Sequence, residues 1–280
     1  MIDTRLVADT AAVSPRTAHE QNVVGTMNIL AACGGPGSPV RKVVFKSSAH
    51  YYGCHQDDPS FFTEEMARPH PPETRLEADI VEADDAVGGF ARRNPNVTVT
   101  TLRFCNGLGP DLETSHTALL GLPAVPGILG FDPRYQFIHE DDLVGVLHHA
   151  VTHDLPGVYN AAPDGVLVLS EVASLLGKPY APLLPPWGTG LATAALAPLG
   201  LRFPEVVRRQ LRFGRGLDNR KLKLAGYRFA LTTRETVQAF AEALRLAPLR
   251  ESAGAPYRYE REVEELLRYS PSVRREGDAP

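Results

Sequence analysis

The first two thirds of the chain alternate short apolar runs with longer stretches whose apolar residues recur every three or four positions. Short β-branched runs are typical of buried parallel strands, and the longer spacing is typical of helices that bury one face. The runs predict strands over residues 4–13, 40–45, 97–104 and 158–161. The longer spacing predicts helices over residues 18–33, 74–94 and 141–153. This alternation, with short links, predicts an α/β fold built on a parallel sheet.

The second half of the chain is less periodic, and residues 179–186 form a proline-rich connection. We expect one helix to begin at Ser170, with this serine as its N-cap, and another to cover residues 233–246 with Thr233 as its N-cap. Residues 191–201 are rich in Ala and Leu, but the run is too short for a membrane span, so it predicts a core or interface helix. Residues 249–280 are expected to be a partly disordered tail.

Composition narrows the classes of function. The chain has 29 Lys and Arg against 33 Asp and Glu, a net charge of −4, which argues against nucleic acid or an anionic membrane as the main partner. Its three cysteines form no Cys-x-x-Cys pair, so neither a disulfide framework nor a zinc ribbon is expected. No apolar run approaches the length of a membrane span, and the first ten residues do not read as a signal peptide. We therefore expect a cytoplasmic protein.

Five stretches match, in order, the motifs of one known family. They are NVVGT (22–26), KVVFKSSAHYYG (42–53), LRFCNGLGP (102–110), FIHEDDL (137–143) and LDNRKLKLAGY (217–227). Each stretch is weak evidence alone, but together they cover about residues 3–246. The chain resembles the extended short-chain dehydrogenase/reductase family, in its NAD-dependent epimerase/dehydratase branch, and within it an actinobacterial subgroup.

The resemblance implies part of a Rossmann fold, a doubly wound parallel sheet, with a small C-terminal substrate-binding domain. It implies NAD or NADP as cofactor, a small-molecule substrate that is a sugar nucleotide or a hydroxy or keto compound, and it allows a homodimer. Placed on this sequence, the incomplete NAD(P)-binding part covers residues 1–110 and 137–165. The substrate-binding part covers residues 111–136 and 166–248.

The family's chemistry is hydride transfer, with a Tyr as acid/base, a Lys that lowers the pKa of that Tyr, and a Ser or Thr that holds the substrate hydroxyl. A phenol has an ordinary pKa of about 10, so a nearby ammonium is needed to favour phenolate near neutral pH. Ser48, four residues before Tyr52, matches the catalytic hydroxyl. It is expected at the carboxyl end of a parallel strand, where doubly wound sheets bind ligands. The alternative is a serine that only caps a turn.

The Tyr-x-x-x-Lys pair is missing. The family pattern aligns best with residues 76–84 (LEADIVEAD), which places Leu76 at the Tyr position and Ile80 at the Lys position. A shifted alignment does not rescue the pair, because residues 53–134 contain no Tyr and residues 47–177 contain no Lys. Tyr51 or Tyr52 is a conceivable substitute, although packing in the turn is the simpler interpretation.

The glycine-rich dinucleotide fingerprint is missing as well. It must follow a strand and open a helix so that free N–H groups meet the pyrophosphate. The only early glycine cluster, residues 34–37, follows a predicted helix and precedes a strand. Since the first predicted strand resembles the family's fourth, about 60 residues of two βαβ units are missing before it. We hypothesise that Met1 is an internal or misassigned start, and we expect the first strand to be an exposed edge.

The resemblance also assigns binding residues. Those expected at the cofactor are Ala11, Ala12, Asn22 and Phe104, and those expected at the substrate are Asn106, Arg134 and Arg215. An asparagine can equally fix the turn that follows it, and arginines suit a diphosphate but are more often solvated surface groups. Arg212 is a further arginine that could bind a diphosphate.

Three functions remain open at this point. The first is an NAD(P)-dependent epimerase, dehydratase or reductase that is impaired as written, and the second is a non-catalytic descendant that binds a ligand or partner. The third is an enzyme of different chemistry with Asp79, Glu82 or His50 as its base. No metal site is predicted, because His148, His149 and His153 lack a third ligand with metal-site spacing.

Overall fold

The computed structural model describes residues 1–9, 13–35, 37–185, 187, 190 and 205–252. The chain divides into two compact units, Met1–Ala241 and Glu242–Pro280. The fold and the site below belong to the first unit, and the described part of the second is the end of one helix. In the described part of the chain, no helix is both long enough and apolar enough to span a membrane. The predictions for residues 191–201 and for most of the tail lie outside the described residues.

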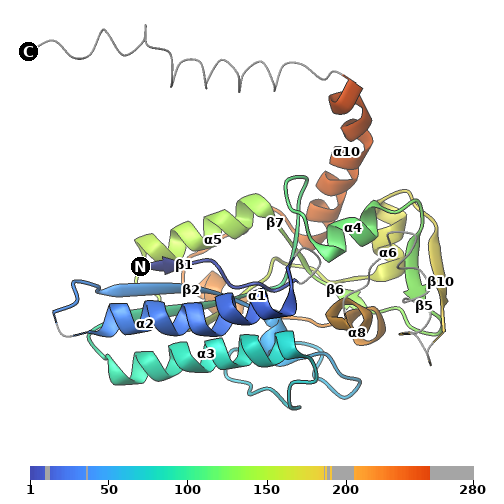
Figure 1. Cartoon of the computed structure of the whole chain (residues 1–280). Helices are drawn as coiled ribbons and strands as arrows, with labels where there is room; N and C mark the ends of the chain where they lie inside the picture. Colours follow the sequence, from blue (N-terminus) through green and yellow to red (C-terminus); the bar gives the residue numbers. More distant parts are fainter. Residues whose placement is uncertain (10–12, 36, 186, 188–189, 191–204, 253–280) are drawn as a thin grey trace, which may run out of the picture. The chain divides into compact units, whose positions relative to one another are not determined.

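A parallel four-stranded sheet forms the centre of the first unit (Figure 1), as predicted. Its strands are β1 (Ile2–Asp3), β2 (Lys42–Ser48), β3 (Thr98–Phe104) and β8 (Gly157–Ala161), in the order β1-β2-β3-β8. Ser48 lies opposite Phe104, and Phe104 lies opposite Ala161. The carboxyl ends of β2, β3 and β8 therefore meet at one edge of the sheet.

The strand predicted over residues 4–13 is wrong for residues 4–9 and 13, because in the described part of this region only Ile2–Asp3 pair with β2. Beyond Asp3 the backbone leaves the sheet, and a side chain replaces the missing strand partner. The Asn22 amide accepts a hydrogen bond from the Val7 N–H at 2.7 Å and donates one to the Val7 carbonyl at 2.9 Å. Among the described residues β1 pairs with β2 alone, so it is an edge strand, as expected.

Helices cover both faces of the sheet (Figure 1). One face carries α1 (Pro15–His19), a π-helical segment (Glu20–Gly25), α2 (Thr26–Gly34) and α3 (Arg75–Arg93). The core on this side includes Phe45, Ile80 and Phe90. The other face carries α5 (Glu140–Thr152), whose Val146 packs with Val44 and Leu102. The predictions of these three helical regions and of the strands over 40–45, 97–104 and 158–161 are confirmed within a few residues.

The remaining described elements are short, apart from the last helix, which has 20 residues. They are the 3-10 turn η2 (Ala49–Tyr52), β4 (Asn106–Leu108), α4 (Ser115–Gly121), β5 (Val125–Ile128), β6 (Arg134–Tyr135), β7 (Phe137–His139), β9 (Leu167–Val168), α6 (Leu169–Leu175), β10 (Tyr180–Leu184), α8 (Glu205–Phe213), α9 (Arg220–Leu224) and α10 (Thr233–Ser252). Three two-stranded pairs, β4 with β7, β5 with β10 and β6 with β9, lie outside the main sheet. The division into cofactor and substrate parts stays a prediction.

Both predicted N-caps are wrong, for a local reason in each case. Ser170 lies inside α6, where its hydroxyl donates to Asp132 at 2.6 Å instead of capping the helix. At α10 the capping residue is Thr232: its hydroxyl accepts from the Glu235 N–H, and the Glu235 carboxylate accepts from the Thr232 N–H. The Thr233 hydroxyl instead donates to the Gly165 carbonyl at 2.8 Å.

Candidate functional site

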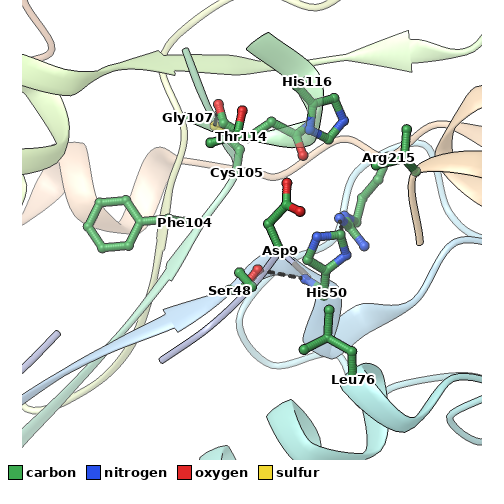
Figure 2. Close-up of a pocket in the computed structure, with 13 residues that line it drawn as sticks. Asp9, Ser48, His50, Leu76, Phe104, Cys105, Gly107, Thr114, His116 and Arg215 are labelled. Carbon is green, nitrogen blue, oxygen red and sulfur yellow. Dashed lines mark hydrogen bonds between the residues drawn. The ribbon is translucent and has the colours of Figure 1, made fainter. Parts of the chain in front are cut away.

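A pocket of about 80 Å³ opens where β2 and β3 end and where the chain passes after β1 (Figure 2). Its lining comes from distant parts of the sequence. The lining residues are Ala8, Asp9, Ser48, His50, Leu76, Phe104, Cys105, Asn106, Gly107, Thr114, His116, Val207 and Arg215. The carboxyl ends of parallel strands are where doubly wound sheets bind ligands, so this pocket is the candidate site.

Arg215 brings a buried positive charge to the pocket. Its guanidinium donates to the Gly53 carbonyl at 2.7 Å and to Nδ1 of His50 at 3.2 Å, and the residue is 9% exposed. No carboxylate lies within ion-pair distance of it in the part of the chain that the structure describes. A buried charge without an opposite charge is unfavourable unless a ligand supplies one. Arg215 is therefore suited to an anionic group.

His50 lies beside Arg215 as a neutral imidazole. Burial, and then the positive charge of Arg215, lowers the pKa of His50 well below its ordinary value. Because Nδ1 accepts the hydrogen bond from Arg215, the ring proton is on Nε2, and His50 can act there as a donor. The backbone N–H of His50 donates to the Ser48 hydroxyl oxygen at 3.3 Å (Figure 2). Ser48 thus caps the turn and also lines the pocket, and its role as a catalytic hydroxyl stays a prediction.

A chain of side-chain hydrogen bonds holds the opposite wall. Nε2 of His116 donates to Oε1 of Gln210 at 2.7 Å, and the Gln210 amide donates to Oδ1 of Asn106 at 3.2 Å. The Asn106 amide in turn donates to the Gln136 carbonyl at 3.4 Å. Asn106 therefore lines the pocket with both ends of its amide already engaged by the protein. Burial lowers the pKa of His116, so this wall also carries a neutral imidazole.

Asp9 ties the segment after β1 to the start of α4. Its carboxylate accepts hydrogen bonds from the N–H and the hydroxyl of Ser115, both at 2.6 Å. In Figure 2 the Asp9 carboxylate lies between His116 and the pair formed by His50 and Arg215, while the Phe104 ring stands apart from them. Asp9 is the one carboxylate among the described lining residues, and Ser115 rather than Arg215 holds it.

The two positions that the family pattern assigns to Tyr and Lys are apolar here. Leu76 lines the pocket from the first turn of α3, and Ile80 is fully buried in the core. Tyr52 does not replace them: its hydroxyl donates to Asn160 at 2.9 Å, its ring stacks on Phe62, and burial raises its pKa. No phenol or ammonium is among the described lining residues.

The three residues considered as alternative bases, Asp79, Glu82 and His50, lie in different surroundings. Asp79 is held by Nδ1 of His19 at 2.8 Å and does not line the pocket, and Glu82 is exposed. His50 alone of the three is in the pocket. Of the histidines considered as metal ligands, His149 donates from Nε2 to the Ala225 carbonyl at 3.0 Å, and Nδ1 of His153 lies 3.1 Å from the His149 carbonyl.

Four of the residues expected at a site come together, namely Ser48, Phe104, Asn106 and Arg215. Two others, Asn22 and Arg134, do not join them. The Asn22 amide is hydrogen-bonded to the backbone of Val7. Arg134 is exposed on β6, and its backbone carbonyl accepts a hydrogen bond from the Arg215 N–H. Ala11 and Ala12 lie outside the described residues. Arg212 places its guanidinium 5.2 Å from the centre of the Phe131 ring.

Sequence reasoning missed Asp9, His116 and Gln210. Asp9 could have been found, since it precedes the two alanines expected to line the cofactor cleft and is the acidic residue nearest to them. His116 and Gln210 carry no local signal. His116 lines the pocket, and Gln210 holds it there through a hydrogen bond between residues 94 positions apart.

The described residues do not assemble a dinucleotide site. The 280 residues contain no glycine-rich strand–turn–helix fingerprint, and the Asn22 amide has both its groups satisfied by Val7. The first turns of α3 and α4 reach the pocket through Leu76 and Thr114, but neither helix opens with the glycine-rich fingerprint of a dinucleotide site. The residues described therefore do not fit NAD by themselves.

Comparison with known proteins agrees with this fold and motif set. A sequence model of the NAD dependent epimerase/dehydratase family matches residues 7–162, more than half of the chain. The chain belongs to this family. Protein Rv0501 of Mycobacterium tuberculosis and protein Mb0513 of Mycobacterium bovis, both termed uncharacterized, are each 32% identical to it over 259 residues. Those alignments cover 89% of this chain and 67% of each relative.

Solved structures of epimerase/dehydratase enzymes share the fold of this family member. MoeE5, solved in complex with UDP-glucuronic acid and NAD, is 20% identical, with a TM-score of 0.62 over 86% of this chain and 77% of its own. A UDP-galactose 4-epimerase is 22% identical, with a TM-score of 0.57 over 84% of this chain and 73% of its own. At these identities the likeness establishes the Rossmann-type architecture.

Proposed function

We propose that this protein binds a sugar nucleotide, or a similar polyhydroxylated anion, and that the hydride chemistry of its family is lost or impaired in the chain. One observation carries the proposal. The pocket keeps the groups that bind, above all the unpaired cation Arg215, while Leu76 occupies the position of the proton-transferring Tyr. Leucine has no proton to transfer, and Ile80 supplies no ammonium to lower the pKa of a phenol.

Each binding group has a role that its contacts suggest. Arg215 is suited to pair with a carboxylate or phosphate, because a guanidinium binds such groups through two parallel hydrogen bonds. The Ser48 hydroxyl and Nε2–H of His50 are suited to sugar hydroxyls. Leu76 and Phe104 supply apolar surface to the less polar face of a sugar ring. NAD supplies hydride transfer in the family.

The named ligands of structural neighbours support this ligand class. Besides MoeE5 with UDP-glucuronic acid or UDP-glucose, they include a UDP-glucuronic acid 4-epimerase in complex with NAD. A nucleotide diphosphate and a uronate carboxylate are both anions of the kind that an uncompensated Arg215 favours. We further propose a homodimer and a cytoplasmic location, whereas NAD or NADP, the cofactor of the family, is not expected to bind the chain by itself.

The alternative of a different enzyme with His50 as base is less well supported. The Nδ1 lone pair of His50 already accepts a hydrogen bond from Arg215, and Nε2 carries the proton. The burial that lowers the pKa of His50 also makes it a weaker base. The geometry favours a donor.

Calorimetric titration of the full chain tests the proposal. UDP-glucuronic acid and UDP-glucose should bind without added cofactor, whereas NAD(H) alone should not. Arg215→Met should weaken the sugar nucleotide, and Arg16→Met, at an exposed residue that does not line the pocket, should leave it unchanged. Overnight incubation with NAD and each sugar nucleotide should give no epimer by chromatography. Conversion of substrate, or the failure of both sugar nucleotides to bind, would contradict the proposal.

A further inference from the structure

A second polar cluster lies in the loop between the 3-10 turn and α3, apart from the pocket lining. It contains Asp57, Asp58 and His70, and one potential ligand atom of each lies within 4.8 Å of the other two. Nε2 of His70 is 3.0 Å from Oδ1 of Asp57 and 3.8 Å from Oδ1 of Asp58. Nothing in the sequence pattern or in the family motifs quoted above assigns these residues a role.

One atom of this cluster lacks the partner that its burial demands. The Asp58 side chain is only 5% exposed, and its Oδ1 is buried without a hydrogen-bond partner among the described residues. The other oxygen, Oδ2, accepts the His55 N–H at 2.6 Å, which fixes the carboxylate so that Oδ1 is on the side of His70. A buried carboxylate oxygen left unpaired is costly, so each such atom in a native protein calls for an explanation.

We propose that Asp57, Asp58 and His70 bind one divalent transition-metal ion of the zinc class. Zinc–nitrogen and zinc–oxygen bonds of about 2.0–2.2 Å place tetrahedral ligand atoms about 3.4 Å apart, between the two distances measured from His70. One imidazole and two carboxylates form a mixed donor set that favours such ions over Ca²⁺, which takes six to eight oxygens. Asp57 is 73% exposed, which gives an ion a path from solvent and leaves room for water ligands.

The surroundings hold the ligands and limit which others can join. The His55 ring lies 4.1 Å from the His70 ring, and the backbone of His55 orients Asp58. Cys54 is not a candidate ligand, since its thiol donates to the Gly214 carbonyl and burial raises its pKa to about 11. The nearby cation Arg209 is neutralised by Glu73 at 2.7 Å, so it does not cancel the two aspartates.

The ion would have a structural role. The loop that carries Asp57 and Asp58 begins just after Gly53, whose carbonyl accepts from Arg215 in the pocket. An ion that binds this loop when it is folded, and not in the unfolded chain, stabilises the fold by its binding free energy. A metal-free ion pair between His70 and Asp57, with a water on Asp58, is the competing explanation and predicts no metal dependence.

Metal titration of the full chain decides between the two. After chelator treatment and dialysis, Zn²⁺ should bind at one site by calorimetry and raise the melting temperature, and Co²⁺ should give visible absorption bands. Asp58→Asn and His70→Gln should each weaken Zn²⁺ by about tenfold or more. Asp57→Asn alters an exposed side chain and tests the site even if a buried variant fails to fold. Asp154→Asn, at an exposed carboxylate paired with Lys42, is the matched control and should bind like the parent chain.

The opposite results would overturn the site. They are no saturable Zn²⁺ binding by the parent chain, or equal affinity in the parent, Asp57→Asn and Asp58→Asn chains. In either case the cluster is an ion pair with bound water.

Discussion

Two buried arginines that contact the 3-10 turn η2 have opposite electrostatic surroundings. Arg103, on β3, is 4% exposed and holds Asp84 through two hydrogen bonds of 2.7 and 3.2 Å, with its guanidinium 3.4 Å from the centre of the Tyr51 ring. Arg215 is nearly as buried, but among the described residues its guanidinium donates to the Gly53 carbonyl and to the neutral ring of His50 and is in no ion pair. One charge is compensated within the protein, and the other is not.

The difference separates groups that hold the fold from groups that await a ligand. Burial lowers the pKa of Arg103, but its hydrogen bonds and charge attraction to Asp84 outweigh that effect and raise the pKa overall. Burial lowers the pKa of Arg215, with no comparable partner to reverse the effect. A folded protein tolerates such an unpaired charge where function requires it. The comparison indicates a role in stability for Arg103 and supports the proposed role of Arg215 in binding.

The largest expected effect is the loss of the paired charge. Arg103→Met should lower the free energy of unfolding by about 3–5 kcal/mol, because it leaves Asp84 buried without a counter-charge. Arg215→Met removes a buried cation that has no carboxylate partner, so it should cost only about 1–2 kcal/mol, for its two hydrogen bonds. Urea unfolding near neutral pH compares the two variants, with Arg16→Met as an exposed control. Equal losses of stability in Arg103→Met and Arg215→Met would contradict the different roles given to the two arginines.

The second expected effect is on affinity and has the reverse pattern. Arg215→Met should weaken the proposed sugar-nucleotide ligand by about 10- to 100-fold, the range for a lost hydrogen bond to a charged group. Arg215→Lys should recover part of that affinity, because an ammonium keeps the charge but not the two-pronged geometry. Asn106→Ala breaks the side-chain network of the opposite wall. It therefore measures how much affinity is lost when the position of that wall is disturbed and the charge of Arg215 is kept. Calorimetry measures all three, and an unchanged Arg215→Met affinity would place the anion elsewhere.

Two adjacent serines sharpen the comparison, because successive residues of a strand point to opposite faces. The Ser47 hydroxyl donates to Asp84 at 2.7 Å beneath α3, whereas Ser48 lines the pocket. Ser47→Ala should cost about 1.5–3 kcal/mol of stability, as a hydrogen bond to a charged group, and leave affinity unchanged. Ser48→Ala should do the reverse, with a smaller loss of stability and a several-fold loss of affinity. A result in which both serines affect the same quantity contradicts the assignment of faces.

The sheet and its covering helices were predictable because their signals are local. Val43, Val44 and Phe45 are consecutive and buried on both faces of β2, and Leu76, Ile80 and Val87 recur at helical spacing along α3. The first strand was overpredicted, because nothing local shows that Asn22, fifteen residues later, satisfies the backbone of Val7 in place of a strand.

The site was predictable only where it touches the ends of strands. Ser48, Phe104 and Asn106 follow directly from the motifs at β2 and β3. The opposite wall depends on contacts such as Asp9 with Ser115, which are 106 residues apart and leave no periodic trace in the sequence. The absence of an acid/base Tyr was evident from the sequence, but that Leu76 faces the pocket while Ile80 faces the core required the structure.

The smallest expected effect is a pH dependence of stability that originates at His50. Burial, then the charges of Arg215, His116 and Arg68, holds the pKa of His50 in the folded protein well below 6.5, the value taken for the unfolded chain. Below pH 6.5 the unfolded chain therefore binds more protons, so the free energy of unfolding should fall as the pH falls, by at most about 1.4 kcal/mol per pH unit from this residue. Above pH 6.5 the contribution is fully present.

Urea midpoints between about pH 8 and pH 5 measure this slope. His50→Gln keeps an acceptor for Arg215 but does not titrate, so its slope should be shallower than that of the parent chain. His116, whose pKa burial also lowers, should account for part of the remainder. His148→Gln, at an exposed position outside the pocket, should keep the parent slope. If His50→Gln and His148→Gln lose stability equally with falling pH, then His50 is not held neutral beside Arg215, and the charge of that arginine must be compensated by a group other than a ligand.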